Sequence, residues 1–274
     1  MRIACKTILF AALAVGPYRR TASAQVLLDP GQLDQLVSRI ALYPDALLAQ
    51  VLTASTYPEQ IPNAAQWADQ HSYLAGDSLA AAINQDNLPW DPSVLALLPF
   101  PSVLDMMAGN IQWTRQFGDA VLGQRGDVMD AVQRMRQTAF DNGNLRTGPQ
   151  YSVVAQGPGS IQIVPVIPMV YFVPAYDPFA VFVRPAAGVA VGITFGPRIV
   201  VGNAFAPWGW GRSSLSWTTR TIVIDGHPWA RTHENRAVYS HPYAVPHPPP
   251  GPRIERHELK PPPGHRESRS ENLR

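Results

Sequence analysis

Apolar residues recur every three or four positions through the first half of the chain, which predicts amphipathic helices. Several of these stripes begin after a proline, and two follow the pairs Asp29-Pro30 and Asp91-Pro92. Aspartate is a favoured N-cap residue and proline suits the first helical position, so each pair predicts a helix start. We therefore expect residues 25–147 to form a compact bundle of several short helices, each begun by a proline.

Two Tyr-Pro pairs lie fourteen residues apart in this region, at Tyr43-Pro44 and Tyr57-Pro58. Each proline is predicted to begin a helix, and each tyrosine to pack back onto that helix as a staple. A pair of ligand-binding tyrosines is the alternative, and the packing role is favoured.

The last stripe of the bundle is aromatic at Trp113 and Phe117 and then aliphatic. Core packing explains such a stripe better than a cofactor site does. Asn142-Gly143 predicts the end of this helix.

The pattern changes to alternation in residues 148–225, where Ser160–Val164, Val170–Val173 and Thr221–Ile224 read as strands. Prolines interrupt these runs, so the strands should be short or lie at sheet edges. We expect a small antiparallel, Gly- and Trp-containing β segment after the helices, which makes the fold class α+β.

The run Gly188–Gly196 has two interpretations. Its glycines at every fourth position are typical of helices packed in membranes, whereas its alternating valines favour a strand. The apolar stretch is too short to span a bilayer as a helix, so the strand is favoured. Insertion of residues 186–206 into an outer membrane remains an alternative.

Residues 226–274 contain ten prolines, eight basic and five acidic residues, and few large apolar ones. Such a composition cannot offset the entropy of ordering by burial, so a disordered Pro/His-rich tail is predicted.

The first 24 residues have the pattern of a signal peptide. Two basic residues precede the short apolar run Thr7–Gly16, and Ala22-Ser23-Ala24 resembles a cleavage site. Removal of residues 1–24 would leave 18 basic and 20 acidic residues and would remove Cys5, the only cysteine. The sequence therefore predicts an exported, periplasmic or outer-envelope protein without disulfides or thiol chemistry.

No residue set in the sequence points to a reaction or a cofactor. His233-Glu234 begins a zinc-protease motif, but Ala237 stands where the second histidine should be. His71 is expected at a helix end, and the six tail histidines match no compact metal-ligand spacing. We expect no catalytic residues, no metal and no cofactor, and the acidic helical segment also disfavours nucleic acid.

Four blocks in a fixed order, Leu36–Pro58, Trp90–Met107, Gln112–Arg136 and Val170–Pro178, resemble the bacterial domain-of-unknown-function family 3300. They cover roughly residues 30–183. The resemblance implies an exported envelope protein of a Gram-negative bacterium, with a helical N-terminal region and a variable C-terminal region. It implies no activity and no catalytic residues.

These observations favour a non-enzymatic binding or structural protein. The candidate contact residues are Tyr171, Tyr176 and Asp177, although ordinary strand and turn packing explains them as well. The partner would be an envelope protein or polymer, with peripheral membrane association as a further expectation. The alternative is a hydrolase that acts on an envelope polymer through carboxylates that the sequence does not pair.

Overall fold

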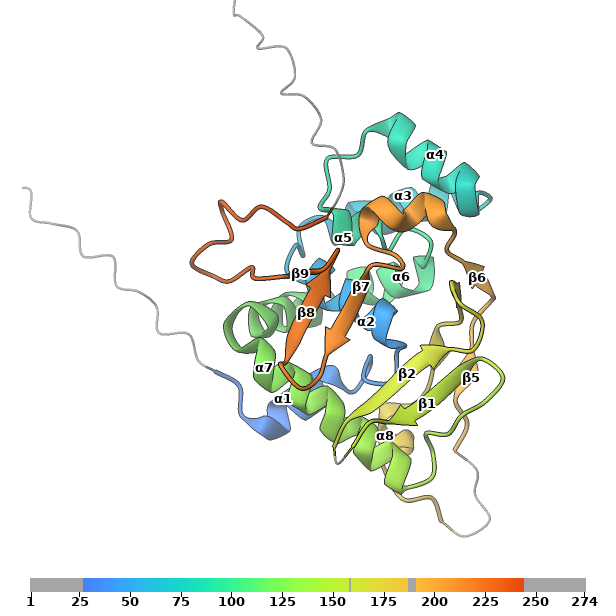
Figure 1. Ribbon diagram of the computed structural model, residues 1–274, viewed down its shortest axis with the longest axis vertical. Coiled ribbons are helices and arrows are strands. Elements are labelled where there is room, and N and C mark those ends of the chain that lie inside the picture. The colour runs from blue at the N-terminus through green and yellow to red at the C-terminus, as the bar shows by residue number, and fades with distance from the viewer. Residues whose placement is uncertain (1–26, 158, 187–190, 244–274) are drawn as a thin grey trace, which may run out of the picture. The chain divides into compact units, whose positions relative to one another are not determined.

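The computed structural model describes residues 27–157, 159–186 and 191–243. The signal peptide predicted for residues 1–24 lies outside them. Seven helices occupy the described part of the first half, in the order drawn in Figure 1. They are α1 (Pro30–Val37), α2 (Asp45–Ala54), α3 (Ile61–Gln70), α4 (Gly76–Asp86), α5 (Pro92–Leu95), α6 (Pro101–Gly109) and α7 (Ile111–Asp141).

The predicted Asp-Pro helix starts are confirmed. Asp29 accepts a hydrogen bond of 2.9 Å from the Gln32 amide, and the Gln32 side chain accepts one of 3.0 Å from the Asp29 amide. This reciprocal pair is a capping box, which satisfies two main-chain donors that the helix itself cannot. Asp91 caps α5 through a single hydrogen bond of 2.9 Å, which its side chain accepts from the amide of Ser93.

The two Tyr-Pro pairs behave differently from the prediction. Pro44 is extended and precedes α2 as its N-cap, so the helix begins one residue later. Pro58 lies in a turn closed by a hydrogen bond from the Gln60 amide to the Tyr57 carbonyl, and α3 begins only at Ile61. The prediction that Pro58 begins a helix was therefore wrong, because a turn separates it from α3.

The prediction of short helices that all begin with proline was also wrong for α4, which begins at Gly76, and for α7. Helix α7 has 31 residues and starts after Asn110, and it ends at Asp141, directly before Asn142-Gly143, which confirms the predicted stop. Its regular geometry breaks once, at Gln124, whose φ is −146° and ψ is 46°. The Gln124 side chain exchanges two hydrogen bonds, of 2.8 and 3.0 Å, with the main chain of Leu28. A tertiary contact thus accompanies the break, with no proline involved.

The second half forms small antiparallel sheets, as predicted. The strands are β1 (Tyr151–Ala155), β2 (Ile161–Pro165), β3 (Val170–Tyr171), β4 (Pro174–Ala175), β5 (Thr194–Phe195), β6 (Ile199–Val200), β7 (Ser213–Ser216), β8 (Thr221–Ile224) and β9 (His227–Pro228). They pair as β1–β2, β3–β6, β4–β5 and β7–β8–β9, and every pair is antiparallel. Two short helical segments interrupt them, α8 (Pro178–Val181) and the 3₁₀ turn η1 (Asn203–Trp208).

The strand predicted over Gly188–Gly196 is only partly described, since residues 187–190 lie outside the described part. Within the remainder, only Thr194 and Phe195 form a strand. Val191 and Ile193 pack on a core cluster that includes residues of both strands of the β1–β2 hairpin. Among the described residues, no helix is long and apolar enough to cross a bilayer.

A buried ion pair between two helices also connects them to the strands. Asp45 of α2 and Arg136 of α7 form an ion pair of 2.6 Å, with the arginine side chain fully buried. The Asp45 carboxylate also accepts hydrogen bonds from the Ile163 amide of β2 and from the Trp217 indole after β7. The described residues form one compact unit, so the helical and β-rich regions are not separate bodies.

Residues 226–243 are packed against this unit, which corrects the predicted start of the tail. Trp229 is 1 % exposed and Tyr243 is 6 % exposed, and the Tyr243 hydroxyl donates to the Gln50 side chain. These aromatic side chains bury enough apolar surface to order the segment. The average composition of residues 226–274 is low in large apolar residues, so it predicted disorder although Trp229 and Tyr243 are present. Residues 244–274 lie outside the described part.

Candidate functional site

An apolar groove of about 770 Å³ lies between the helical bundle and the segment that includes β4 and α8. One wall is polar and comes from α1 and the residues after it, including Asp34 and Arg39. The rest of the lining is mainly apolar and comes from α6, α7 and the segment that includes β4 and α8. Its main side chains are Met106, Met135, Pro174, Tyr176, Phe179 and Phe182. A groove of this volume with an aromatic wall is suited to an apolar ligand group.

Phe179 is the most exposed large apolar side chain of this groove, at 86 %. It follows Pro178 in the first turn of α8, where Asp177 caps the helix by accepting a hydrogen bond of 2.8 Å from the Phe179 amide. The cap fixes the main chain of Phe179 while its ring remains in solvent. An exposed ring beside an apolar groove is a common feature of binding surfaces.

The three predicted contact residues have different positions. Tyr171 is 3 % exposed and packs in the core, with its ring 4.8 Å from that of Trp210. Tyr176 lines the groove, whereas Asp177 caps α8 and is not part of the groove wall. The structure therefore places only Tyr176 in the groove, and it does not bring the three together as one surface.

The hydroxyl of Tyr176 accepts a hydrogen bond of 3.3 Å from the Leu42 amide, and its ring lies edge-on to Phe182. Burial raises the pKa of Tyr176, and burial also raises the pKa of its neighbour Tyr43 to about 12. Both phenols are therefore neutral at physiological pH, and neither adds charge to the groove.

The charged groups at the groove rim are paired or hydrogen bonded. Asp34 forms an exposed ion pair of 2.6 Å with Arg134, and Arg39 donates to the Asn110 side chain. The groove therefore offers an incoming ligand apolar contact and little net charge.

The other predicted chemistry can be placed as well. His71 ends α3, as expected for a helix-end residue, and stacks on Trp67 at 3.9 Å between ring centroids. Within the described ranges, no three His, Cys, Asp or Glu side chains gather where they could hold a metal ion. His247, His257 and His265 lie outside those ranges.

The Tyr43 and Tyr57 rings do not form a pair. Tyr43 is 5 % exposed at the polar wall of the groove. The Tyr57 ring centroid lies 3.8 Å from the guanidinium carbon of Arg231, in the packed C-terminal segment. Tyr57 thus contacts residues distant in sequence.

Comparison with known proteins adds a family to this geometry. Residues 29–243 match the family described as protein of unknown function, DUF3300. The chain belongs to the DUF3300 family. Family membership was expected from the four sequence blocks, but the match extends about sixty residues beyond them and ends at the last described residue, Tyr243.

One curated protein that is similar to this chain is the uncharacterized protein YacH of Escherichia coli strain K12. It is 39 % identical over 166 residues, which are 59 % of this chain and 27 % of YacH. The chain thus spans about a quarter of the length of this relative. No solved structure matches the chain.

Most residues of the apolar groove could not be recognised from the sequence. Tyr176 was identified because it lies in the Val170–Pro178 block, but Met106 and Met135 resembled any other helix positions. Phe179 directly follows an Asp-Pro pair, which is a helix-start signal in this chain. That signal could have located α8, but not the exposure of the ring.

Proposed function

We propose that this protein is exported to the bacterial cell envelope and binds an extended apolar segment of a partner protein, without catalysing a reaction. The observation that carries the proposal is the Phe179 ring, 86 % exposed at the edge of the apolar groove. The signal-peptide pattern of residues 1–24 supports export.

The chemistry of the groove favours a protein segment over a polysaccharide. Sugars are bound through many hydrogen bonds, whereas the apolar lining of the groove consists mainly of Pro, Met and aromatic side chains. Aromatic-lined grooves of this kind accept extended, proline-containing segments, because such segments lose little entropy on binding.

Five aspartates stabilise the fold through helix caps or ion pairs, which agrees with a binding role. Asp29, Asp91 and Asp177 cap helices, and Asp34 and Asp45 form ion pairs with arginines. A hydrolase would need a pair of carboxylates that are not already used in a helix cap or an ion pair.

A photo-crosslinking amino acid at position 179, in the full-length protein in its own bacterium, tests the groove. The matched control is position 238, because Val238 is 85 % exposed and does not line the groove. We expect a discrete crosslinked product from position 179 and none from position 238. Met106→Lys, which places a charge in the groove, should abolish the product.

Identical products from both positions, or none from position 179, would refute the binding site. N-terminal sequencing of the protein from the periplasmic fraction tests export separately, and the mature chain should begin at Gln25. An intact N-terminus at Met1 would refute export.

A further inference from the structure

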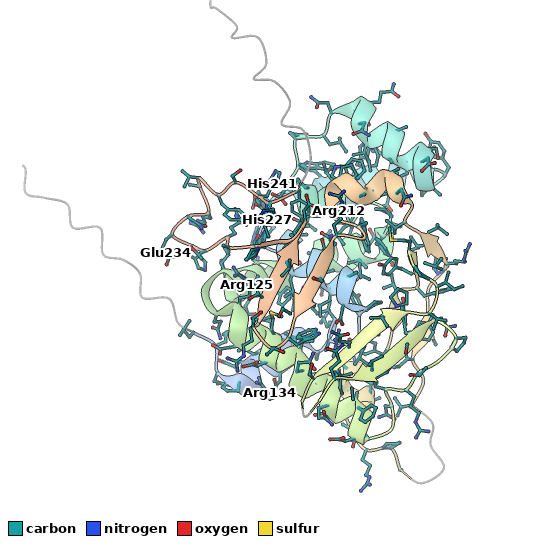
Figure 2. All side chains as sticks on the ribbon, in the orientation of Figure 1. Arg125, Arg134, Arg212, His227, Glu234 and His241 are labelled. Atoms are coloured by element: carbon teal, nitrogen blue, oxygen red, sulfur yellow. The ribbon has the colours of Figure 1, made fainter. Side chains whose placement is uncertain are left out.

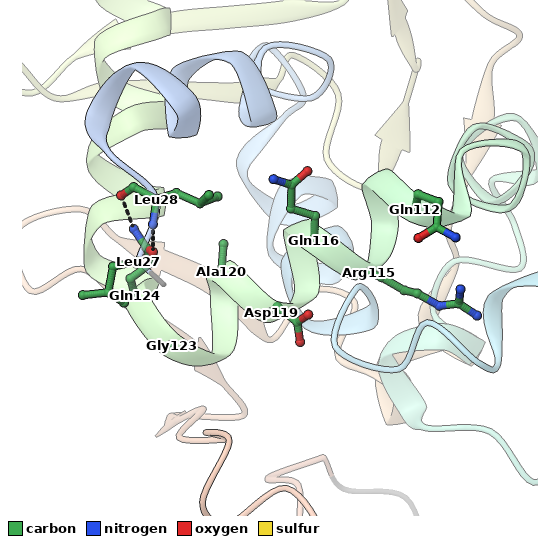
Figure 3. A pocket seen from close by; sticks show the side chains of 9 residues that line it. All are labelled: Leu27, Leu28, Gln112, Arg115, Gln116, Asp119, Ala120, Gly123 and Gln124. Carbon is green, nitrogen blue, oxygen red and sulfur yellow. Dashed lines mark hydrogen bonds between the residues drawn. The ribbon is translucent and has the colours of Figure 1, made fainter. Parts of the chain in front are cut away.

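A second hollow, of about 320 Å³, lies between the end of α2, the first half of α7 and the segment after β9. It shares no lining residue with the apolar groove. Its charged lining side chains are Glu59, Arg115, Asp119, Arg231 and Arg236. Arg115 and Asp119 also line the neighbouring hollow of Figure 3, where they extend from α7.

Arg231 is the most unusual of these residues, since it is only 7 % exposed. Its guanidinium donates to the main-chain carbonyls of Thr56 and Arg236 and stacks on the Tyr57 ring. Its buried Nε has no hydrogen-bond partner. None of the four ion pairs among the described residues includes Arg231.

A buried cation without an anion is costly, because its charge has left water and no carboxylate replaces the lost solvation. Two carbonyls and an aromatic face offset only part of this cost. Each terminal nitrogen of Arg231 uses one N–H group for a carbonyl and keeps a second one, which an oxyanion bound in the hollow could accept.

The fold holds Arg231 in place from two sides. Gly118 lets α7 approach the main chain of Ser55 and Thr56, because any Cβ at this position would lie 2.1 Å from the Ser55 carbonyl oxygen. On the other side, Arg125 donates a hydrogen bond of 2.6 Å to the Arg231 carbonyl. Figure 2 labels Arg125 where α7 meets the C-terminal segment.

The charge of the hollow indicates which oxyanion it suits. Arg231, Arg115 and Arg236 contribute three positive charges, and Glu59 and Asp119 contribute two negative ones. A singly charged carboxylate would neutralise the net charge of about one positive unit, whereas a doubly charged phosphate group would leave an uncompensated negative charge and would cost more to remove from water. Glu59 and Asp119 are hydrogen-bond acceptors in the same lining, which suits a ligand that also offers N–H groups, as a peptide does.

We propose that this hollow binds the carboxylate of a peptide-like monoanion. Arg231 is the fixed partner of the carboxylate, and the exposed Arg115 and Arg236, which line the same hollow, supply further N–H donors. The proposal is independent of the apolar groove, because the two sites share no residue.

Isothermal titration of the full mature chain with three probes tests the proposal. The probes are N-acetyl-Ala-Ala with a free carboxylate, the same dipeptide as its C-terminal amide, and inorganic phosphate. We expect saturable binding of the acid with a Kd below about 1 mM, and binding of the amide at least about tenfold weaker. Binding of the acid should weaken as salt is added.

Variants connect this binding to the hollow. Arg115→Gln and Arg236→Gln change exposed residues and should each weaken the acid at least about threefold while the chain remains folded. Arg198→Gln is the matched control, since Arg198 is exposed and lies outside the hollow, and it should change nothing. Equal affinity for acid and amide, tighter binding of phosphate, absence of saturation, or equal effects of all three variants would overturn the proposal.

Discussion

Arg136→Met and Arg134→Met are expected to differ strongly in their effect on stability, although both arginines lie in α7 and both pair with an aspartate at 2.6 Å. The Arg136 side chain is 0 % exposed and that of Arg134 is 41 % exposed, and Figure 2 shows Arg134 at the outer side of α7. Exposed ion pairs contribute about 0–1 kcal/mol, whereas breaking a buried pair costs about 3–5 kcal/mol.

The structure supports the upper part of that range for Arg136. Its guanidinium donates to the carbonyls of Ala41, Tyr43 and Ile161, each at 2.8 Å, in addition to the Asp45 carboxylate. Each carbonyl left without a donor in the core costs about 1–3 kcal/mol further, unless water enters. We therefore expect Arg136→Met to lose at least about 3 kcal/mol, and Arg134→Met to lose at most about 1 kcal/mol.

Urea unfolding followed by tryptophan fluorescence measures both free energies, and Trp217 reports on the site because its ring lies 4.8 Å from the Arg136 guanidinium. The double variant Arg136→Met/Asp45→Asn should be more stable than the sum of the single losses predicts, because the neutral amide that replaces the Asp45 carboxylate leaves no unpaired buried charge. If Arg136→Met does not fold, Arg136→Lys, which keeps the charge but loses the fork, should still fold with reduced stability. Equal losses for the two arginines, or strict additivity of the double variant, would refute the reasoning.

Two further predictions concern α7 and the α3–α6 surface. Gly118→Ala should lose about 1–3 kcal/mol of stability, because the new Cβ would lie 2.1 Å from the Ser55 carbonyl oxygen. Gly126→Ala in the same helix has space for the Cβ and should be neutral or stabilising in thermal unfolding. A loss of the same size at both positions would contradict this reasoning. Partial burial, and then the charge of Asp69, raise the pKa of Asp105 above its ordinary 3.8, so the folded state binds this proton more tightly and ionised Asp105 destabilises the protein at neutral pH. Asp105→Asn should therefore raise the Tm slightly at pH 7 and leave it unchanged below pH 3.8, and an equal gain at both pH values would exclude the charge as the cause.

The sequence alone determined the features that depend on neighbours within a few positions. The cap of α1 joins residues three apart, and the Asn142-Gly143 stop and the short strand β8 are equally local. Family membership also followed from sequence blocks, because it is a property of residue order.

The groove and the second hollow were decided by tertiary structure. Met106 and Phe179 meet at one groove although they are distant in sequence. The hydrogen bond from Arg231 to Thr56 joins residues 175 positions apart. No local pattern specifies which distant carbonyl a given arginine will reach.

The same limit applies to the start of the C-terminal segment and to the buried ion pair. Trp229 orders its segment because its side chain is buried against distant parts of the fold. The proline-rich composition of the following residues does not reveal this burial. Arg136 and Asp45 lie 91 positions apart and look like surface residues in the sequence. Local propensity specifies helix ends and strands, whereas long-range packing specifies which charges are buried, and burial gives those charges their energetic weight.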